Sequence, residues 1–281
     1  MLGLIALLAL LGFGFVLHAS YPGYLNPDSF WQLKQILGER YNDWHAPFMT
    51  LVWSLTHTLV PGPAGVVVLD NLLVWGALAL LAAAAARLVG AWAVLILLTP
   101  LFPGLFNYLG HVHKDAMLVA WMLAAFACAF CGNDPTATPR VRLVWMVLAN
   151  LFALAAFLTR ANVVFALVPL LLYANLPLGR RRTWLAVLLM LCLMPGFQAV
   201  QNRVLDVEAK YPGDSIKTFH LLALSYFEGV ISFPGAGPRV TRKGLSKPVI
   251  RQCNGIPPPN GGSAPACSTV SNAKRYGAVR R

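Results

Sequence analysis

Residues 2 to 17 read LGLIALLALLGFGFVL, and they run directly into the polar and aromatic stretch YPGYLNPDSFWQ at residues 21 to 32. The first stretch carries no charge and approaches the length of about 20 apolar residues that a helix needs to cross a bilayer. The second stretch therefore begins at the membrane surface, and it holds a carboxylate, Asp28. Because a charge beside the hydrocarbon core is costly, we expect Asp28 to serve a function.

The same apolar pattern recurs along most of the chain. Of the 281 residues, 58% are hydrophobic and only 11% are charged. Repeated apolar runs of this length indicate several membrane-crossing helices and exclude a soluble domain. We predict an all-α fold, a polytopic transmembrane helical bundle of about seven spans with interfacial helices in its first external loop. The predicted spans cover residues 2–17, 66–86, 89–109, 116–131, 143–158, 163–178 and 183–200.

The positive charge is concentrated near the C-terminal end. Residues 1–233 hold 13 Lys and Arg against 10 Asp and Glu, whereas residues 234–281 hold nine Lys and Arg and no acid. No basic face interleaved with aromatic residues is present, so we expect no nucleic-acid partner. The last stretch is rich in Pro and Gly, a composition typical of a disordered tail. The predicted organisation is a bundle at 1–200, a short external segment at 201–233 and the tail.

Arginines orient the predicted spans, because positively charged connections favour the cytoplasmic side. The arginines in short connections are Arg87, Arg140, Arg142 and Arg180–Arg182. With these inside, residues 111–115, residues 159–162 and everything after residue 200 face the other side. Residues 18–65 then form one large external loop. Its apolar stretch at 47–60 is too short to cross and suits a re-entrant or interfacial helix.

The first external loop contains a helix start. Asn26 followed by Pro27 is typical of a helix cap and first turn. Asp28 then falls in that first turn, where the helix dipole favours a carboxylate anion. The apolar face expected for this helix consists of Phe30, Leu33, Ile36 and Leu37.

Polar groups from three external loops are expected to converge. The first loop supplies Asp28, Asp43 and His45, the second supplies His111 and the run His113–Asp115, and the third supplies Arg160 and Asn162. Carboxylates and imidazoles can bind a divalent metal ion, for which we select Asp28, His113 and Asp115. Lys114 and Arg160 suit phosphate oxygens. Such a site would handle a phosphorylated substrate at the membrane surface.

Each of these residues also has a purely structural interpretation. Asp28 is also suited to stabilising a helix start, and His45 to starting the helix that follows it at Pro47. The 111–115 cluster fits a solvated loop, and Arg160 fits a side chain that reaches from the apolar region to the interface. A further alternative concerns the first span, which could be a signal peptide cleaved near LHAS at 17–20.

The order of these features resembles the GT-C superfamily of membrane glycosyltransferases, which includes protein O-mannosyltransferases and bacterial lipid A aminoarabinose transferases. One span is followed by a long external loop with an early acidic residue, Asp28, and by a His-x-Pro helix start at His45 to Pro47. A later external acid, Asp115, and the sequence TRAN at 159–162 before an apolar run complete the resemblance. It covers roughly residues 1 to 200.

The resemblance implies a polyprenyl-phosphate-linked sugar as donor and a lipid, polysaccharide or protein of the cell envelope as acceptor. It also implies an integral protein of the bacterial inner membrane. Asp28 would be the catalytic base, His45 and Asp115 would position it or hold a divalent metal, and Arg160 with Lys114 would bind the donor phosphate.

Two features depart from the family pattern. Ala46 stands where relatives carry the first of two prolines after the histidine, and the chain is shorter than most members. Two alternatives therefore stay open. One is a transporter or flippase-like protein without chemistry, in which Asp70 and the external charges line a path. The other is an inactive, truncated relative whose reading frame changes near Phe233.

Overall fold

Long apolar helices make up most of the structure, a computed structural model that describes residues 1–211, 213–214, 217, 219–221 and 223. The chain divides into two units, Met1–Lys210 and Tyr211–Arg281, and the helical bundle is the first. This unit extends past residue 200, where we expected the bundle to end. The predicted tail at 234–281 lies outside the described residues.

The bundle confirms the predicted fold class. Within the described residues, six helical segments are long and apolar enough to cross a membrane. Five of them match predicted spans one to one. These are α1 (Leu2–Ser20), α6 (Lys114–Gly132), α7 (Pro139–Thr159), α9 (Arg180–Val204) and the segment Ala161–Leu178, which joins η2 (Ala161–Val163), α8 (Val164–Asn175) and η3 (Leu176–Leu178).

The sixth segment, Ala64–Leu101, combines two predicted spans. It contains α4 (Ala64–Val89) and the 3₁₀ helix η1 (Gly90–Leu101), which packs back against α4. The chain reverses at Gly90, whose positive φ of 61° suits glycine. After η1, the short helix α5 (Pro103–Leu109) completes the return. Pro100 and Pro103 lack a backbone N–H, which explains why residues 89–109 do not form one continuous α-helix.

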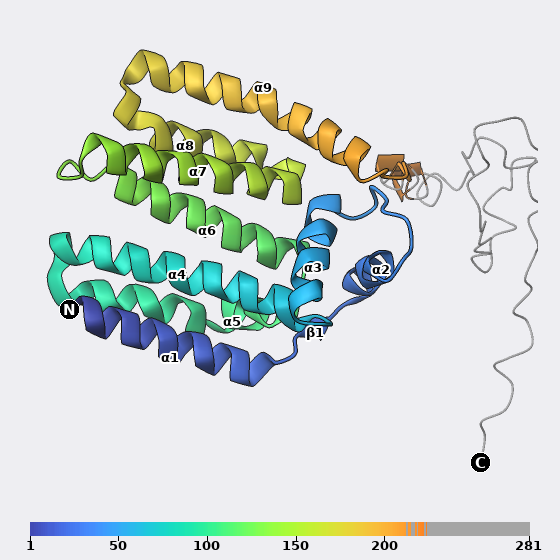
Figure 1. Cartoon of the computed structure of the whole chain (residues 1–281), viewed down its shortest axis with the longest axis horizontal. Helices are drawn as coiled ribbons and strands as arrows, with labels where there is room; N and C mark the ends of the chain where they lie inside the picture. Colours follow the sequence, from blue (N-terminus) through green and yellow to red (C-terminus); the bar gives the residue numbers. More distant parts are fainter. Residues whose placement is uncertain (212, 215–216, 218, 222, 224–281) are drawn as a thin grey trace, which may run out of the picture. The chain divides into compact units, whose positions relative to one another are not determined.

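The connections sort into two ends of the bundle (Figure 1). One end holds the loop between α1 and α4, the connection between α5 and α6, and the connection between α7 and α8; we call it the loop end. The opposite end holds the α4–η1, α6–α7 and α8–α9 turns, which carry or adjoin the arginines predicted to be cytoplasmic. We call it the arginine end. The structure therefore groups the same three loops that the arginine pattern grouped.

Two helices of the first loop lie across the loop end (Figure 1). They are α2 (Pro27–Ile36) and α3 (Pro47–Leu59). As predicted, α3 is not among the segments able to span a membrane. Its buried residues Met49 and Trp53 join the core formed by α6, α7 and α8. This packing holds the first loop against the ends of the spanning helices.

Helix α2 packs against the bundle mainly through polar residues. Its fully buried residues are Ser29, Gln32 and Gln35, whereas Phe30 and Leu37 are exposed. Leu33 and Ile36 are only partly buried, against the core. The polar stripe turns inward because buried partners are available there: the amide of Gln32 donates to the Thr50 hydroxyl at 3.3 Å.

Helix α6 lies at the centre of the bundle, where it packs against α4, α7 and α8. Its buried side chains are mostly alanine, and small residues allow neighbouring helices to approach closely. The outer helices α1 and α9 instead expose large leucines along their length. In a bilayer these leucines contact lipid chains, which makes the chain an integral multi-pass membrane protein.

Close packing between α1 and α4 provides a test of the bundle. A Cβ at Gly12 would lie 2.1 Å from the Trp75 ring, whereas a Cβ at Gly14 would meet no atom within 4 Å. We expect Gly12→Ala to destabilise the protein by about 1–3 kcal/mol through overpacking. Gly14→Ala on the same helix should be neutral or slightly stabilising. Thermal unfolding in detergent, followed by circular dichroism, measures both; equal midpoints would contradict the α1–α4 packing.

Candidate active site at the loop end

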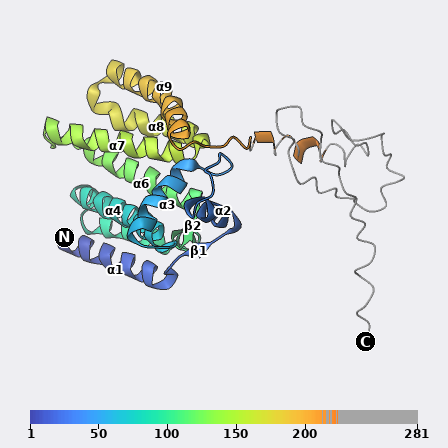
Figure 2. The same ribbon diagram turned by 45° about the vertical axis from the view of Figure 1, so that its right-hand side comes forward.

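A short parallel sheet joins the α1–α4 loop to the α5–α6 connection, the first and second loops of the loop end. Strand β1 (Tyr24–Leu25) pairs with β2 (His111–Val112), with Tyr24 opposite His111 and Leu25 opposite Val112 (Figure 2). The hydroxyl of Ser29 adds a hydrogen bond to the carbonyl of Val112. Each strand leads directly into a helix that carries candidate site residues. The sheet therefore sets the distance between the first turns of α2 and α6.

The start of α2 confirms the predicted cap. The side chain of Asn26 accepts a hydrogen bond from the backbone N–H of Ser29 at 2.8 Å, and Pro27 occupies the first helical position. Asp28 follows in the first turn, and about half of its side chain is exposed, 47%. Since Asn26 supplies the cap, Asp28 is not needed for that purpose.

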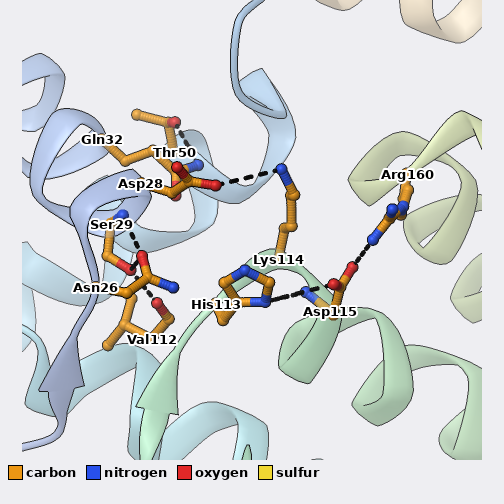
Figure 3. Close-up of polar contacts among 10 residues, drawn as sticks. All are labelled: Asn26, Asp28, Ser29, Gln32, Thr50, Val112, His113, Lys114, Asp115 and Arg160. Atoms are coloured by element: carbon orange, nitrogen blue, oxygen red, sulfur yellow. Dashed lines mark hydrogen bonds and ion pairs between the residues drawn. The ribbon is translucent and has the colours of Figure 1, made fainter. Parts of the chain in front are cut away.

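Asp28 faces the first turn of α6 (Figure 3). Its Oδ2 lies 3.6 Å from the Nζ of Lys114, which joins the first and second loops by an ion pair. His113 precedes Lys114 as the cap of α6, and its Nδ1 accepts the backbone N–H of Asp115 at 3.1 Å. The cap fixes the direction in which Lys114 and Asp115 leave the helix.

A second ion pair joins the second and third loops. Arg160 follows the last residue of α7, and its guanidinium donates to the carboxylate of Asp115 (Figure 3). The side chains of Arg160 and Asp115 are 40% and 32% exposed. The imidazole of His113 lies near the same carboxylate, with its Nδ1 3.6 Å from Oδ2 of Asp115. The site is thus a row of alternating charges, Asp28, Lys114, Asp115 and Arg160, drawn from three loops.

His45 lies beside this row but is buried. Burial lowers its pKa below the ordinary value of 6.5, while the nearby Asp28 carboxylate raises the pKa and Lys114 and His113 lower it. Its Nδ1 has no hydrogen-bond partner among the described residues. Burial likewise lowers the pKa of His113. Both imidazoles are therefore favoured in the neutral form at pH 7.

The structure brings together all six residues selected from the sequence: Asp28, His45, His113, Lys114, Asp115 and Arg160. Sequence reasoning missed Ser29 and Gln32, which attach α2 to its neighbours. Their spacing of three residues, continued at Gln35, was the available signal, since it places polar side chains on one face of a helix.

The predicted metal ligands do not form a preassembled metal site. Among the described residues, no group of three His, Cys, Asp or Glu side chains is placed to hold a metal ion. Of the predicted ligands, Asp28 faces Lys114 and Asp115 faces Arg160, so cations of the chain already neutralise both carboxylates. The residues present therefore do not fit a resident metal, and a divalent ion remains a prediction from the sequence.

Fold and site together define a class, a multi-pass helical membrane protein with a charged, partly exposed site at one end of its bundle. Comparison with protein-family models, with curated proteins and with solved structures finds no match to this chain. The chemistry of the site therefore has to be argued from its own residues.

The buried histidine provides a test that does not depend on function. Because folding lowers the pKa of His45, the unfolded chain binds more protons, and stability should fall as the pH drops below 6.5 through the folded-state pKa. The variant His45→Gln should show a weaker decline, with a remainder from His113. Unfolding midpoints in detergent between pH 8 and pH 5 measure this. An unchanged pH profile in His45→Gln would contradict the buried, neutral imidazole.

Proposed function

We propose that this protein is a glycosyltransferase that moves a sugar from a polyprenyl-phosphate donor to a cell-envelope acceptor. The observation that supports it best is the row of alternating charges at the loop end, where Asp28, Lys114 and Arg160 remain partly exposed. A base and two cations in one charged row, at the edge of a bilayer, suit a substrate with a lipid tail, a phosphate and a sugar. The resemblance to GT-C enzymes, which is carried by the same residues, suggests the same function.

The proposed chemistry uses groups of the chain itself. Asp28 takes the proton from an acceptor hydroxyl or amine, whose oxygen or nitrogen attacks the anomeric carbon of the sugar. The bond between that carbon and the phosphate oxygen breaks, and polyprenyl phosphate leaves. Lys114 and Arg160 stabilise the negative charge that develops on the phosphate. His45 and Asp115 position these groups.

The proposal includes a location and an orientation. Arginines cluster at the opposite end of the bundle, and positively charged connections favour the cytoplasm. The site then faces the outer surface of the membrane, which we propose to be a bacterial inner membrane. A donor with a long prenyl chain reaches such a site by diffusing within the bilayer, so the polar reaction and the lipid carrier share one surface.

Mass spectrometry of envelope glycolipids and glycans tests this function. A strain lacking the gene should lose one sugar from one envelope component, and the wild-type gene should restore it. The mass difference identifies the sugar, and the component that changes identifies the acceptor. Identical envelope masses with and without the gene would refute the proposal.

A second candidate function, transport, is supported by Asp70. This carboxylate lies inside membrane-spanning α4, is buried, and has an Oδ1 without a hydrogen-bond partner among the described residues. Buried carboxylates in membrane helices commonly mark ion or proton paths. A cell-free assay with purified protein, donor and acceptor distinguishes the two functions. A glycosyltransferase adds a sugar to the acceptor in this assay. A transporter leaves the acceptor unchanged and alters only the flux of a solute across a membrane.

A further inference from the structure

Both cations that would bind the donor phosphate are already paired with a carboxylate. Lys114 Nζ lies 3.6 Å from Asp28, and the guanidinium of Arg160 bonds Asp115. In each pair, the cation and the carboxylate come from different loops. An incoming phosphate must therefore compete with the two carboxylates for the N–H groups of Lys114 and Arg160.

The pairs are weak enough to exchange. Their four side chains are between 29% and 47% exposed, so water screens the attraction. Partly exposed pairs of this kind change an equilibrium constant by about two- to fivefold. The phosphate of the proposed donor is a diester with two non-bridging oxygens and one negative charge, so it can offer one oxygen to each cation, and it binds Lys and Arg through charge-assisted hydrogen bonds. A bound phosphate can therefore displace both carboxylates.

We propose that the donor phosphate displaces Asp28 from Lys114 and Asp115 from Arg160, so that a bound donor frees Asp28 for the acceptor. This inference rests on the proposed function. Before the donor binds, the Lys114 ammonium forms an ion pair with the Asp28 carboxylate. Once Lys114 turns to the phosphate, Asp28 has both oxygens available for the acceptor proton. The exchange links the presence of donor to the availability of the base.

Direct binding of a phosphate probe tests the exchange. The full chain, purified in detergent, is titrated with farnesyl phosphate, an isoprenyl monophosphate without a sugar, and the Kd is measured by isothermal titration calorimetry. The variants Asp28→Asn and Asp115→Asn should each bind the probe about two- to fivefold more tightly than the wild type, because each removes an internal competitor. Lys114→Gln and Arg160→Gln should bind it about tenfold more weakly or worse.

Asp134→Asn is the matched control. Asp134 pairs with Arg87 at the arginine end, so its substitution makes the same change in net charge far from the site. Its Kd should equal that of the wild type. Three results separate the hypotheses. Tighter binding in the two site variants, but not in Asp134→Asn, supports the exchange. Weaker binding in Lys114→Gln without tighter binding in Asp28→Asn or Asp115→Asn overturns the exchange and leaves the donor site standing. Absence of binding in every form overturns both.

Discussion

Replacing Asp28 with asparagine is expected to lower the rate of sugar transfer by about a hundred- to ten-thousandfold, the usual contribution of a general base. Asparagine keeps the size and the position of the side chain but cannot take a proton. The fold should survive, because the only ion pair lost among the described residues is the partly exposed one to Lys114, and the helix start keeps its Asn26 cap. The rate is measured with purified protein, a polyprenyl-phosphate sugar and the acceptor identified by mass spectrometry.

Asp43→Asn is the control for this experiment. Asp43 lies in the same α1–α4 loop, but its carboxylate accepts the backbone N–H of Lys210 at 2.5 Å, beyond the end of α9. The substitution is chemically identical and removes a carboxylate outside the charged row. Its transfer rate should stay within about threefold of the wild type, since changes away from the reacting groups are mild. Near-wild-type transfer by Asp28→Asn would exclude Asp28 as the base.

Trp53→Ala is expected to destabilise the protein by about 3–5 kcal/mol, the largest stability effect we predict. The Trp53 side chain is fully buried, 0% exposed, in the core that α3 shares with α6, α7 and α8. Its indole Nε1 also donates to the carbonyl of Gly62 at 2.9 Å, which fixes the turn between α3 and α4. Removing the ring leaves a large cavity and an unpaired carbonyl under the first loop. Chemical or thermal unfolding in detergent measures the loss.

Two further variants test whether the loss of stability comes from the burial of Trp53 or from the removal of any tryptophan. Trp53→Phe keeps most of the ring volume and loses the hydrogen bond, so its cost should be clearly smaller. Trp92→Ala removes the same side chain from η1, where it is 75% exposed, and should change stability little in detergent. If Trp53→Ala and Trp92→Ala had the same midpoint, the docking of α3 onto the bundle would be wrong.

The sequence alone was sufficient for five of the spans, for the order of the helices and for the grouping of their connections. Runs of apolar residues long enough for a bilayer are local features, and arginines near span ends orient them without reference to packing. The cap at Asn26 was equally predictable, because a side chain three residues from its backbone partner needs no distant contact.

The orientation of α2 and the pairing inside the site depended on tertiary structure. Nothing in the sequence shows that Tyr24 lies opposite His111, or that α2 buries Ser29 and Gln32 while exposing Phe30. These features arise where segments far apart in the chain meet and exchange hydrogen bonds, so the burial of each face depends on its neighbour.

The charged residues illustrate both cases. That Asp28, Lys114, Asp115 and Arg160 share one end of the bundle follows from topology, which apolar length and arginine position determine. Which carboxylate faces which cation was decided only by the short β1–β2 sheet and the capped starts of α2 and α6. The sequence was enough to predict which residues belong to the site. The distances between them, which determine what they can bind, depend on long-range packing.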